Sequence, residues 1–213
     1  MTTERMNVHQ ALAELKTMDK RIEAAICGTE WVITNKHSNT LIDGLKVEDW
    51  KNNVKAKFDK VQDLIRRRDA IKRAVVNSNA VTKIEVAGVV YTVAEAIDRK
   101  NHGIGYMKTL VRRLAHDQTQ AKLVADRENG SRLDDRVEAF VRSQVGNTDT
   151  KGMTEEIKKR REEFIAAQTT DVLDPINTRL MIEQLNEELY AFETQVDAAL
   201  STSNAMTYLE ISY

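Results

Sequence analysis

Residues 75–96 read VVNSNAVTKIEVAGVVYTVAEA, and this stretch interrupts a chain that otherwise has a helical rhythm almost throughout. Apolar or β-branched residues alternate with charged residues from Thr82 to Val86, a period of two that is typical of a strand. Ala87-Gly88 suits a tight turn, and residues 89–91 suit a returning strand. The sequence therefore predicts a β-hairpin over about residues 82–91.

Both ends of this hairpin carry helix-boundary signals. The NSN run, Asn77–Asn79, predicts that the preceding helix stops there, because asparagine side chains compete for backbone hydrogen bonds. Thr92 and Glu95 have the spacing of a capping box, in which each side chain accepts a hydrogen bond from the other residue's amide. A two-stranded hairpin is marginal alone. We therefore expect it to act as a structural clasp or as an assembly contact.

The composition favours long helices. The 213 residues include one proline and eight glycines, and 31% of them are charged. The predicted fold class is mainly α: a long-helix bundle, coiled-coil-like, with the small hairpin and a further short strand at the C-terminus. We expect a single helical domain over residues 1–213.

Helical periodicity divides the first half of the chain. One helix is predicted to begin at Asn7, capped with the help of Gln10, and to end at Gly28. A short strand is expected at Trp31–Thr34, and a second helix over about residues 47–76.

The second half is divided in the same way. Gly103 and Gly105 favour a close helix crossing or a local distortion in the third helix, and Asn129-Gly130 favours its end. Residues 146–152 are expected to form a loop, followed by a helix over about residues 154–168. The final helix is predicted to be capped by Asp174, with Pro175 in its first turn. Its bundle seam comprises Ile182, Leu185, Leu189, Phe192, Val196 and Leu200. The tail TYLEISY alternates and is expected to add a strand to the hairpin.

Arg68 lies on the apolar stripe of the second predicted helix, between Leu64 and Ile71. Either its stem packs while its guanidinium reaches solvent, or it faces inward with a partner. The sequence leaves both interpretations open.

Charge and motif content argue against several functions. Lys and Arg number 32 and Asp and Glu 33, so bulk nucleic-acid binding is not expected. Cys27 is the only cysteine, and the four histidines lack metal-ligand spacing. We expect no metal, no cofactor and no enzymatic activity. The polar N-terminus and the lack of a long apolar run favour a cytoplasmic protein with no membrane partner.

Three stretches resemble the septicolysin-like proteins of bacteria and their phages: ALAELKTMDKRIEAA, RRRDAIKRAVVNSNAVTKIEVAGVVYTVAEAIDRK and LMIEQLNEELYAFETQVDAALSTSNAMTYLEI. The resemblance covers about residues 6–31, 60–114 and 172–211, and residues 116–170 have the character of an inserted helical segment. It implies a helical, oligomeric scaffold that is often encoded by phages. It implies no reaction.

Arginine, asparagine and threonine side chains flank the predicted hairpin. The candidate ligand-binding residues are Arg66, Arg68, Arg73, Asn77, Asn79, Thr82, Thr92 and Arg99. Such groups suit a phosphate-bearing small molecule, in a pocket completed across an oligomer interface. The alternative is that they cap helices, form turns and pair with Asp69, Glu95 and Asp98.

Two non-enzymatic functions follow, and both involve a homo-oligomer of two or more copies. In the first, which the sequence favours, a phage-type protein in the host cytoplasm binds a host signalling nucleotide and holds it, as an anti-defence sponge would. In the second, a virion or scaffold protein acts only through coiled-coil contacts.

Overall fold

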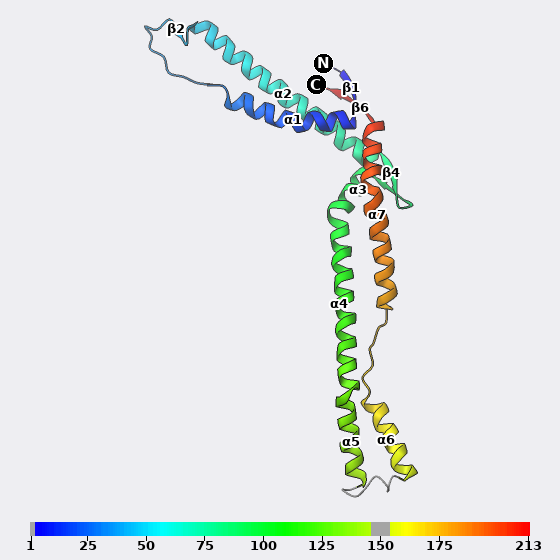
Figure 1. Cartoon of the computed structure of the whole chain (residues 1–213). Coiled ribbons are helices and arrows are strands. Elements are labelled where there is room, and N and C mark those ends of the chain that lie inside the picture. The colour runs from blue at the N-terminus through cyan, green and yellow to red at the C-terminus, as the bar shows by residue number, and fades with distance from the viewer. Residues whose placement is uncertain (1–2, 146–153) are drawn as a thin grey trace. The chain divides into compact units, whose positions relative to one another are not determined.

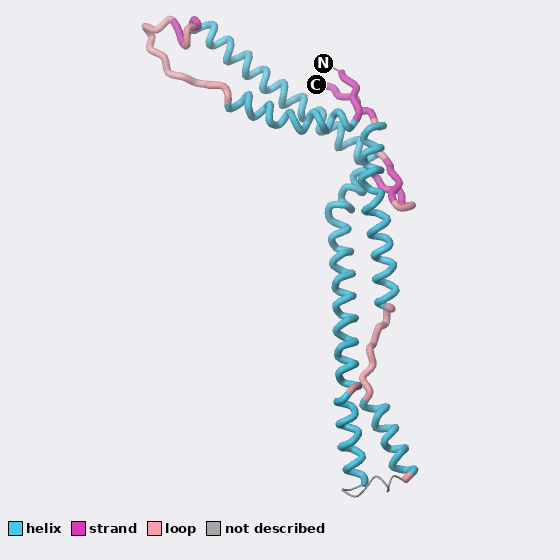
Figure 2. Tube along the Cα trace, viewed as in Figure 1, coloured by secondary structure: helices cyan, strands magenta, loops and turns pink. Residues whose placement is uncertain are grey.

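The computed structural model describes residues 3–145 and 154–213 (Figure 1). The fold is mainly α, as predicted, and among the described residues strands occur only in three two-stranded antiparallel pairs (Figure 2). The chain forms two compact units: Met1–His102 with Ala191–Tyr213, and Gly103–Tyr190. We expected one domain with an insertion over residues 116–170. This stays a prediction, because two compact units need not fold independently of each other.

The first unit begins with two long helices. Helix α1 spans Val8–Cys27, and Asn7 and Gln10 form the predicted capping box at its start. Helix α2 spans Val47–Val81 and follows the short strands β2 (Leu41–Ile42) and β3 (Leu45–Lys46). The prediction of a strand at Trp31–Thr34 is wrong, because Trp31 instead folds back and its indole Nε1 donates to the Ile26 carbonyl at 3.1 Å.

The end of α2 also differs from the prediction. Asn77–Asn79 do not stop the helix, which continues to Val81, five residues beyond the expected end at residue 76. The amide of Thr82 still donates to the Ser78 carbonyl at 2.8 Å, and the backbone becomes extended only at Thr82. The i→i−4 ladder therefore prevails over the local preference of the asparagines, since the buried Val75 fixes this turn in the core.

The predicted hairpin is confirmed. Strand β4 (Lys83–Val86) pairs with β5 (Val89–Thr92), and Val86 and Val89 flank a two-residue turn. Ala87 and Gly88 have φ of 53° and 77°, the left-handed conformations that a type I′ turn needs. The amide of Ala87 donates to Gln195 Oε1 at 3.0 Å. Helix α3 (Val93–Asp98) follows at once, with the predicted Thr92–Glu95 capping box.

The two ends of the described chain form a ribbon. Strand β1 (Thr3–Asn7) pairs antiparallel with β6 (Tyr208–Ser212), from Thr3 opposite Ser212 to Asn7 opposite Tyr208. The C-terminal strand is therefore confirmed, but its predicted partner is wrong: it does not join the β4–β5 hairpin. The alternation in TYLEISY indicates a strand without identifying its neighbour.

This ribbon closes the main core of the first unit. Leu209 and Ile211 are buried and alternate with exposed residues, so one face of the ribbon packs on α1 and α2. The core comprises Met6, Val8, Ala11, Met18, Ile71, Val75, Leu209 and Ile211.

The second unit is built from helices alone in its described part. A π-helical turn, η1 (Arg99–Gly103), precedes α4 (Ile104–Asn129), which confirms the distortion expected near Gly103. Helix α5 (Ser131–Val145) follows Gly130, and α6 (Glu155–Gln168) begins after the cap Thr154. Phe140 and Phe164 stack with centroids 4.3 Å apart and join α5 to α6. The predicted loop at 146–152 lies outside the described residues.

Helix α7 (Thr178–Met206) begins later than predicted. Pro175 lies in a turn before the helix, and Asp174 is four residues before the first helical residue, so the prediction of an Asp174 cap with Pro175 in the first turn is wrong. The Asp174 carboxylate nevertheless accepts the Thr178 hydroxyl at 2.7 Å and the Thr178 amide at 2.8 Å, and these hydrogen bonds, that of the hydroxyl first, lower the pKa of Asp174. Leu189, Phe192 and Val196 of the predicted seam are buried.

Candidate functional site

The predicted ligand-binding residues fall into separate groups along the first unit. Because α2 is continuous to Val81, Asn79 lies thirteen residues after Arg66 on one helix, which is about 20 Å along its axis. A small-molecule pocket of ~300–1,000 Å³ is only about 7–10 Å across. A single chain therefore does not bring Arg66 and Arg68 into one such pocket with the hairpin residues.

Arg66 and Arg68 are held by carboxylates on the surface. Arg66 Nη1 donates to Asp63 Oδ1 at 3.2 Å. Arg68 donates from Nε to Asp19 Oδ1 at 2.7 Å and from Nη1 to Asp69 Oδ1 at 3.1 Å. The hydrogen bond to Asp19, followed by that to Asp69, raises the pKa of Arg68. Arg68 is thus a surface arginine with partners, and the inward-facing interpretation is wrong for it.

Arg73 and Asn77 are exposed and differ from these two arginines. Among the described residues, neither side chain makes a hydrogen bond or an ion pair. Spacings of seven and four put Arg66, Arg73 and Asn77 on the same side of α2. This side of the helix retains a cation that the chain itself does not neutralise.

Thr82, Thr92 and Arg99 lie around the hairpin. Thr82 and Thr92 lie at its open end, where the Val93 amide donates to the Thr82 carbonyl at 2.9 Å. The Thr82 hydroxyl lies 3.3 Å from Ser78 Oγ, and Thr92 caps α3. These side chains serve helix ends. Asn79, half-buried in the last turn of α2, lies close to the same end.

Arg99 packs against aromatic rings. Its guanidinium carbon lies 5.1 Å from the centroid of Phe192 and 5.7 Å from that of Tyr91. The two rings meet edge to face with centroids 5.8 Å apart. Arg99 therefore joins the hairpin to α7 by cation–π contact.

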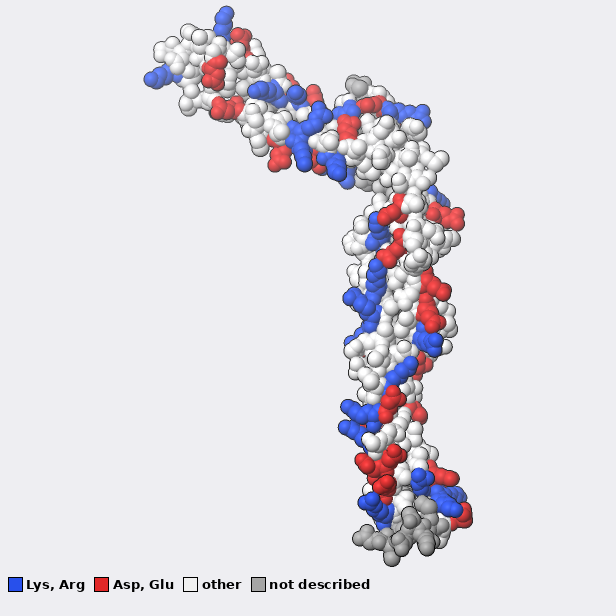
Figure 3. Space-filling view, in the orientation of Figure 1, with Lys and Arg blue, Asp and Glu red and all other residues white. Residues whose placement is uncertain are grey.

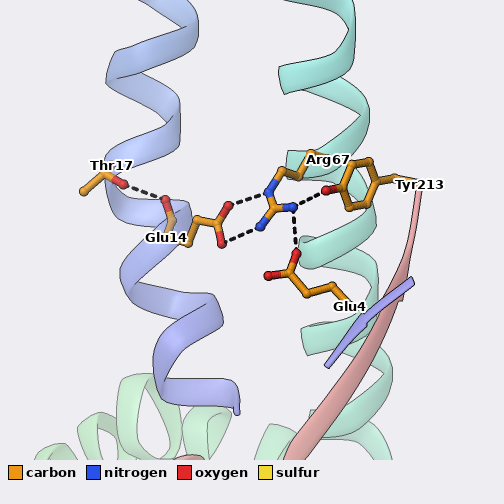
Figure 4. A network of polar contacts seen from close by, with 5 residues as sticks. All are labelled: Glu4, Glu14, Thr17, Arg67 and Tyr213. Carbon is orange, nitrogen blue, oxygen red and sulfur yellow. Dashed lines mark hydrogen bonds and ion pairs between the residues drawn. The ribbon is translucent and has the colours of Figure 1, made fainter. Parts of the chain in front are cut away.

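A further polar network lies outside the candidate set and centres on Arg67, the neighbour of Arg68 (Figure 4). Arg67 Nε donates to Glu14 Oε1 at 2.6 Å and Nη2 donates to Glu14 Oε2 at 3.1 Å, a bidentate pair. Nη1 donates to Glu4 Oε2 at 2.8 Å and to the Tyr213 hydroxyl. Hydrogen bonds to Glu14 and then to Glu4 raise the pKa of Arg67.

The Arg67 network joins four elements of the first unit. Arg67 comes from α2, Glu14 from α1 and Glu4 from β1, and Tyr213 directly follows β6. The Arg67 side chain is 21% exposed and that of Glu14 is 25% exposed, so both charges are largely removed from water. Their mutual neutralisation makes this a structural tie between the helices and the chain ends.

A signal for Arg67 was present in the sequence. Arg67 lies four residues before Ile71, which lies four before Val75, and both of these are buried. Glu14 lies between Ala11 and Met18, both buried, at spacings of three and four. Opposite charges at inward positions of two helices predict a pair. Arg68 was instead placed on the apolar stripe, because it lies four residues after Leu64.

The α1–α2 pair also carries an apolar groove. A hollow of about 660 Å³ is lined by Ile26, Trp31, Val54, Lys55, Phe58, Asp59 and Val61. Trp31 and Phe58 meet edge to face with centroids 6.2 Å apart. A second hollow of about 400 Å³ shares Ile26 and includes Cys27 and Ile65. The residue types suit an apolar surface such as a helix.

The part of the chain that the structure describes contains neither a metal-binding cluster nor a membrane-spanning helix. Residues 3–145 and 154–213 contain no cluster of three or more His, Cys, Asp or Glu placed to hold a metal ion. None of the helices in these ranges has both the length and the apolar composition needed to span a bilayer. Basic and acidic side chains are interspersed over the face in Figure 3, without a broad region of one sign.

Comparison with known proteins finds no matching family model, no similar curated protein and no similar solved structure. The resemblance to septicolysin-like proteins therefore stays a prediction.

Proposed function

We propose that this protein is a non-enzymatic structural or scaffold component that acts as a symmetric homo-oligomer through its helical faces. The supporting observation is its apolar surface. Among the described residues, twenty-three large hydrophobic side chains are exposed, whereas twenty hydrophobic residues are buried. Single exposed apolar residues are ordinary in proteins. A larger number of exposed than of buried apolar side chains is expected of an assembly component that has not bound its partner.

Several of these exposed side chains lie together on one side of a helix. In the first unit Leu12 and Ile26 lie on α1, and Phe58 and Ile65 on α2. In the second unit Tyr106, Leu110 and Val124 lie within about 40° of one another on α4. Stripes of this kind match the helix-on-helix packing of bundles. Closed symmetry would allow every copy to cover the same stripe.

The candidate anion-binding arginines give less support to ligand capture. Arg66 and Arg68 are neutralised by carboxylates of the same chain, and Arg99 lies against two rings. Coiled-coil and bundle contacts need no ligand, so they account for the exposed stripes with fewer requirements.

The concentration dependence of thermal unfolding tests the assembly function. If folding and association are coupled, the Tm should rise as the protein is concentrated from about 1 to 100 μM, because mass action stabilises the oligomer. A Tm that is constant over this range, together with a single-chain mass, would overturn the proposal.

Nucleotide sequestration is the second candidate, favoured by one observation. Arg73 and Asn77 are exposed on one side of α2, and neither has a side-chain partner among the described residues. Across an oligomer, two such sides would face a phosphate-bearing molecule such as a host signalling nucleotide.

A thermal-shift panel of cyclic and linear nucleotides tests this second function. A ligand at 100 times its Kd would add ~2.7 kcal/mol of stability. Arg73→Ala should abolish the shift, while the matched Arg66→Ala, whose charge is already paired, should reduce it less. If no nucleotide raises the Tm of the wild-type protein, the sequestration function is rejected.

A further inference from the structure

We propose that the apolar groove of the α1–α2 pair is the site at which a second copy of this chain binds, face to face, to form a four-helix arrangement. This inference rests on the proposed homo-oligomer and names the surface and the partner that form it. The groove residues are Ile26, Trp31, Val54, Lys55, Phe58, Asp59 and Val61.

The distal halves of α1 and α2 lack a second layer of packing. The buried residues of α1 are Val8, Ala11 and Met18, all in its first half or middle. Those of α2 are Val61, Ile71 and Val75. Residues 19–27 of α1 and 47–60 of α2 therefore contain no fully buried side chain. A helix pair needs a further layer to bury its apolar stripe, and none of the described residues of the first unit supplies it here.

The groove also has the composition of a protein-binding surface. Ile26 and Phe58 are 42% and 51% exposed, although each lies beside other apolar groups. Trp31 is held by its hydrogen bond to the Ile26 carbonyl and by its edge-to-face contact with Phe58. A fixed tryptophan beside exposed apolar residues is the composition of a binding hot spot, since the ring loses little freedom on association.

The charges that line the groove favour a second copy of this chain as the partner. Lys55 and Asp59 line the groove four residues apart on α2. Within the described residues neither side chain makes an ion pair, whereas Arg66, Arg67 and Arg68 of the same helix all do. A surface that offers one unpaired cation and one unpaired anion is self-complementary.

Two-fold symmetry converts this spacing into a contact. Antiparallel pairing of two α2 helices about a point near residue 57 puts Lys55 of each copy opposite Asp59 of the other. An isologous interface repeats each contact twice. Both unpaired charges would then be neutralised while the apolar groove is covered, which is why a second copy fits better than a partner of one charge.

Molar mass measured by light scattering over a dilution series tests the surface. Phe58→Glu should raise the Kd of self-association by about 100-fold, because it puts a charge into the centre of the interface. Ala13→Glu is the matched control, since Ala13 is exposed on α1 and does not line the groove. It should leave the Kd unchanged. Circular dichroism confirms that both variants keep their helices.

A mixing experiment tests the geometry independently. Lys55→Glu and Asp59→Lys should each weaken self-association by about tenfold, because each creates like-charge contacts at both symmetric positions. Mixing the two variants should restore the wild-type Kd, because every contact in the mixed dimer again joins opposite charges. An effect within one chain cannot produce this rescue.

Cys27 provides a third readout. It is exposed and lines the neighbouring hollow beside Ile26. In the wild-type oligomer, Cys27 should react with a maleimide several-fold more slowly than it does in the Phe58→Glu variant.

The outcomes separate this inference from the proposed function. If the wild-type protein is oligomeric but Phe58→Glu associates normally, or the mixed charge variants show no rescue, another surface forms the oligomer and the groove inference is wrong. A wild-type protein of single-chain mass would overturn both.

Discussion

Arg67 Nε donates to Glu14 Oε1 across 2.6 Å, and this pair joins α2 to α1 at a position where both side chains are largely buried. The same guanidinium holds Glu4 and the Tyr213 hydroxyl. One side chain of α2 thus stabilises the arrangement of α1 and of both strands of the terminal ribbon. Its neighbours Arg66 and Arg68 make pairs that are more open to solvent.

Arg67→Met should lower the free energy of unfolding by about 2 kcal/mol. The methionine keeps an apolar stem, but Glu14 is left partly buried without its cation, which is the costly outcome for such a pair. Arg66→Met is the matched control: its ion pair is about two-thirds exposed on both sides, so the change should stay within ~0.5 kcal/mol. Urea denaturation of both variants measures the difference. Equal losses of unfolding free energy in the two variants would show that the Arg67 network stabilises the fold no more than the exposed Arg66–Asp63 pair does.

Thr92→Ala should cost about 1 kcal/mol through the lost cap of α3. The Thr92 hydroxyl accepts the Glu95 amide at 3.1 Å, and alanine leaves that amide to water. Thr92→Ser keeps the hydroxyl and is the control, with an expected loss of a few tenths of a kcal/mol. Chemical denaturation of the two variants at pH 7 makes the comparison, and a Thr92→Ser loss as large as that of alanine would contradict the cap.

The same cap predicts a pH dependence. Hydrogen bonds from Thr92, first from its amide, lower the pKa of Glu95 below its ordinary value of 4.5. The stabilisation is therefore complete above about pH 5, and it is lost as the pH falls through the lowered pKa. Glu95→Gln keeps the capping geometry without the titration. Its stability should fall less steeply than that of the wild type between pH 5 and 3, and parallel curves would argue against the carboxylate's role.

Ala87→Asn should raise the free energy of unfolding by about 0.5–1 kcal/mol. Ala87 has φ of 53°, a conformation that asparagine tolerates better than alanine, and Asn-Gly is the preferred type I′ turn. The hydrogen bond to Gln195 comes from the backbone amide and is kept. Ala94→Asn, at an exposed position within α3, is the control and should lose ~0.5 kcal/mol. Thermal melts of both variants test the turn, and destabilisation by Ala87→Asn would contradict its assigned conformation.

Features set by neighbouring residues were predictable from the sequence. The capping boxes at Asn7 and Thr92, the hairpin turn at Ala87-Gly88 and the distortion at Gly103 each depend on a few consecutive residues. Residue type and spacing were therefore enough to predict them.

Features set by distant residues were not predictable in the same way. Thr3 lies opposite Ser212, and nothing in TYLEISY favours that partner over the hairpin. The Asn77–Asn79 run does favour a helix end locally, yet the packing of Val75 and the hydrogen bond from Thr82 extend α2 past it. Tertiary contacts decided both cases.

The candidate site shows the same division. Thr82 and Thr92 could be assigned to the hairpin from the sequence, whereas the partner of each arginine could not. The extension of α2 is also what separates Arg66 and Arg68 from the hairpin group, because a continuous helix holds them about 20 Å and about 16 Å from Asn79, respectively.

Self-association is the central claim, and the molar mass of the wild-type protein tests it most directly. Light scattering coupled to size exclusion at micromolar concentration should give an integral multiple of the 24.2 kDa of one chain, with two copies as the minimum. On dilution, the mass of the Phe58→Glu variant should begin to fall at a higher protein concentration than the mass of the wild type. A mass of 24.2 kDa for the wild-type protein across that concentration range would contradict the account.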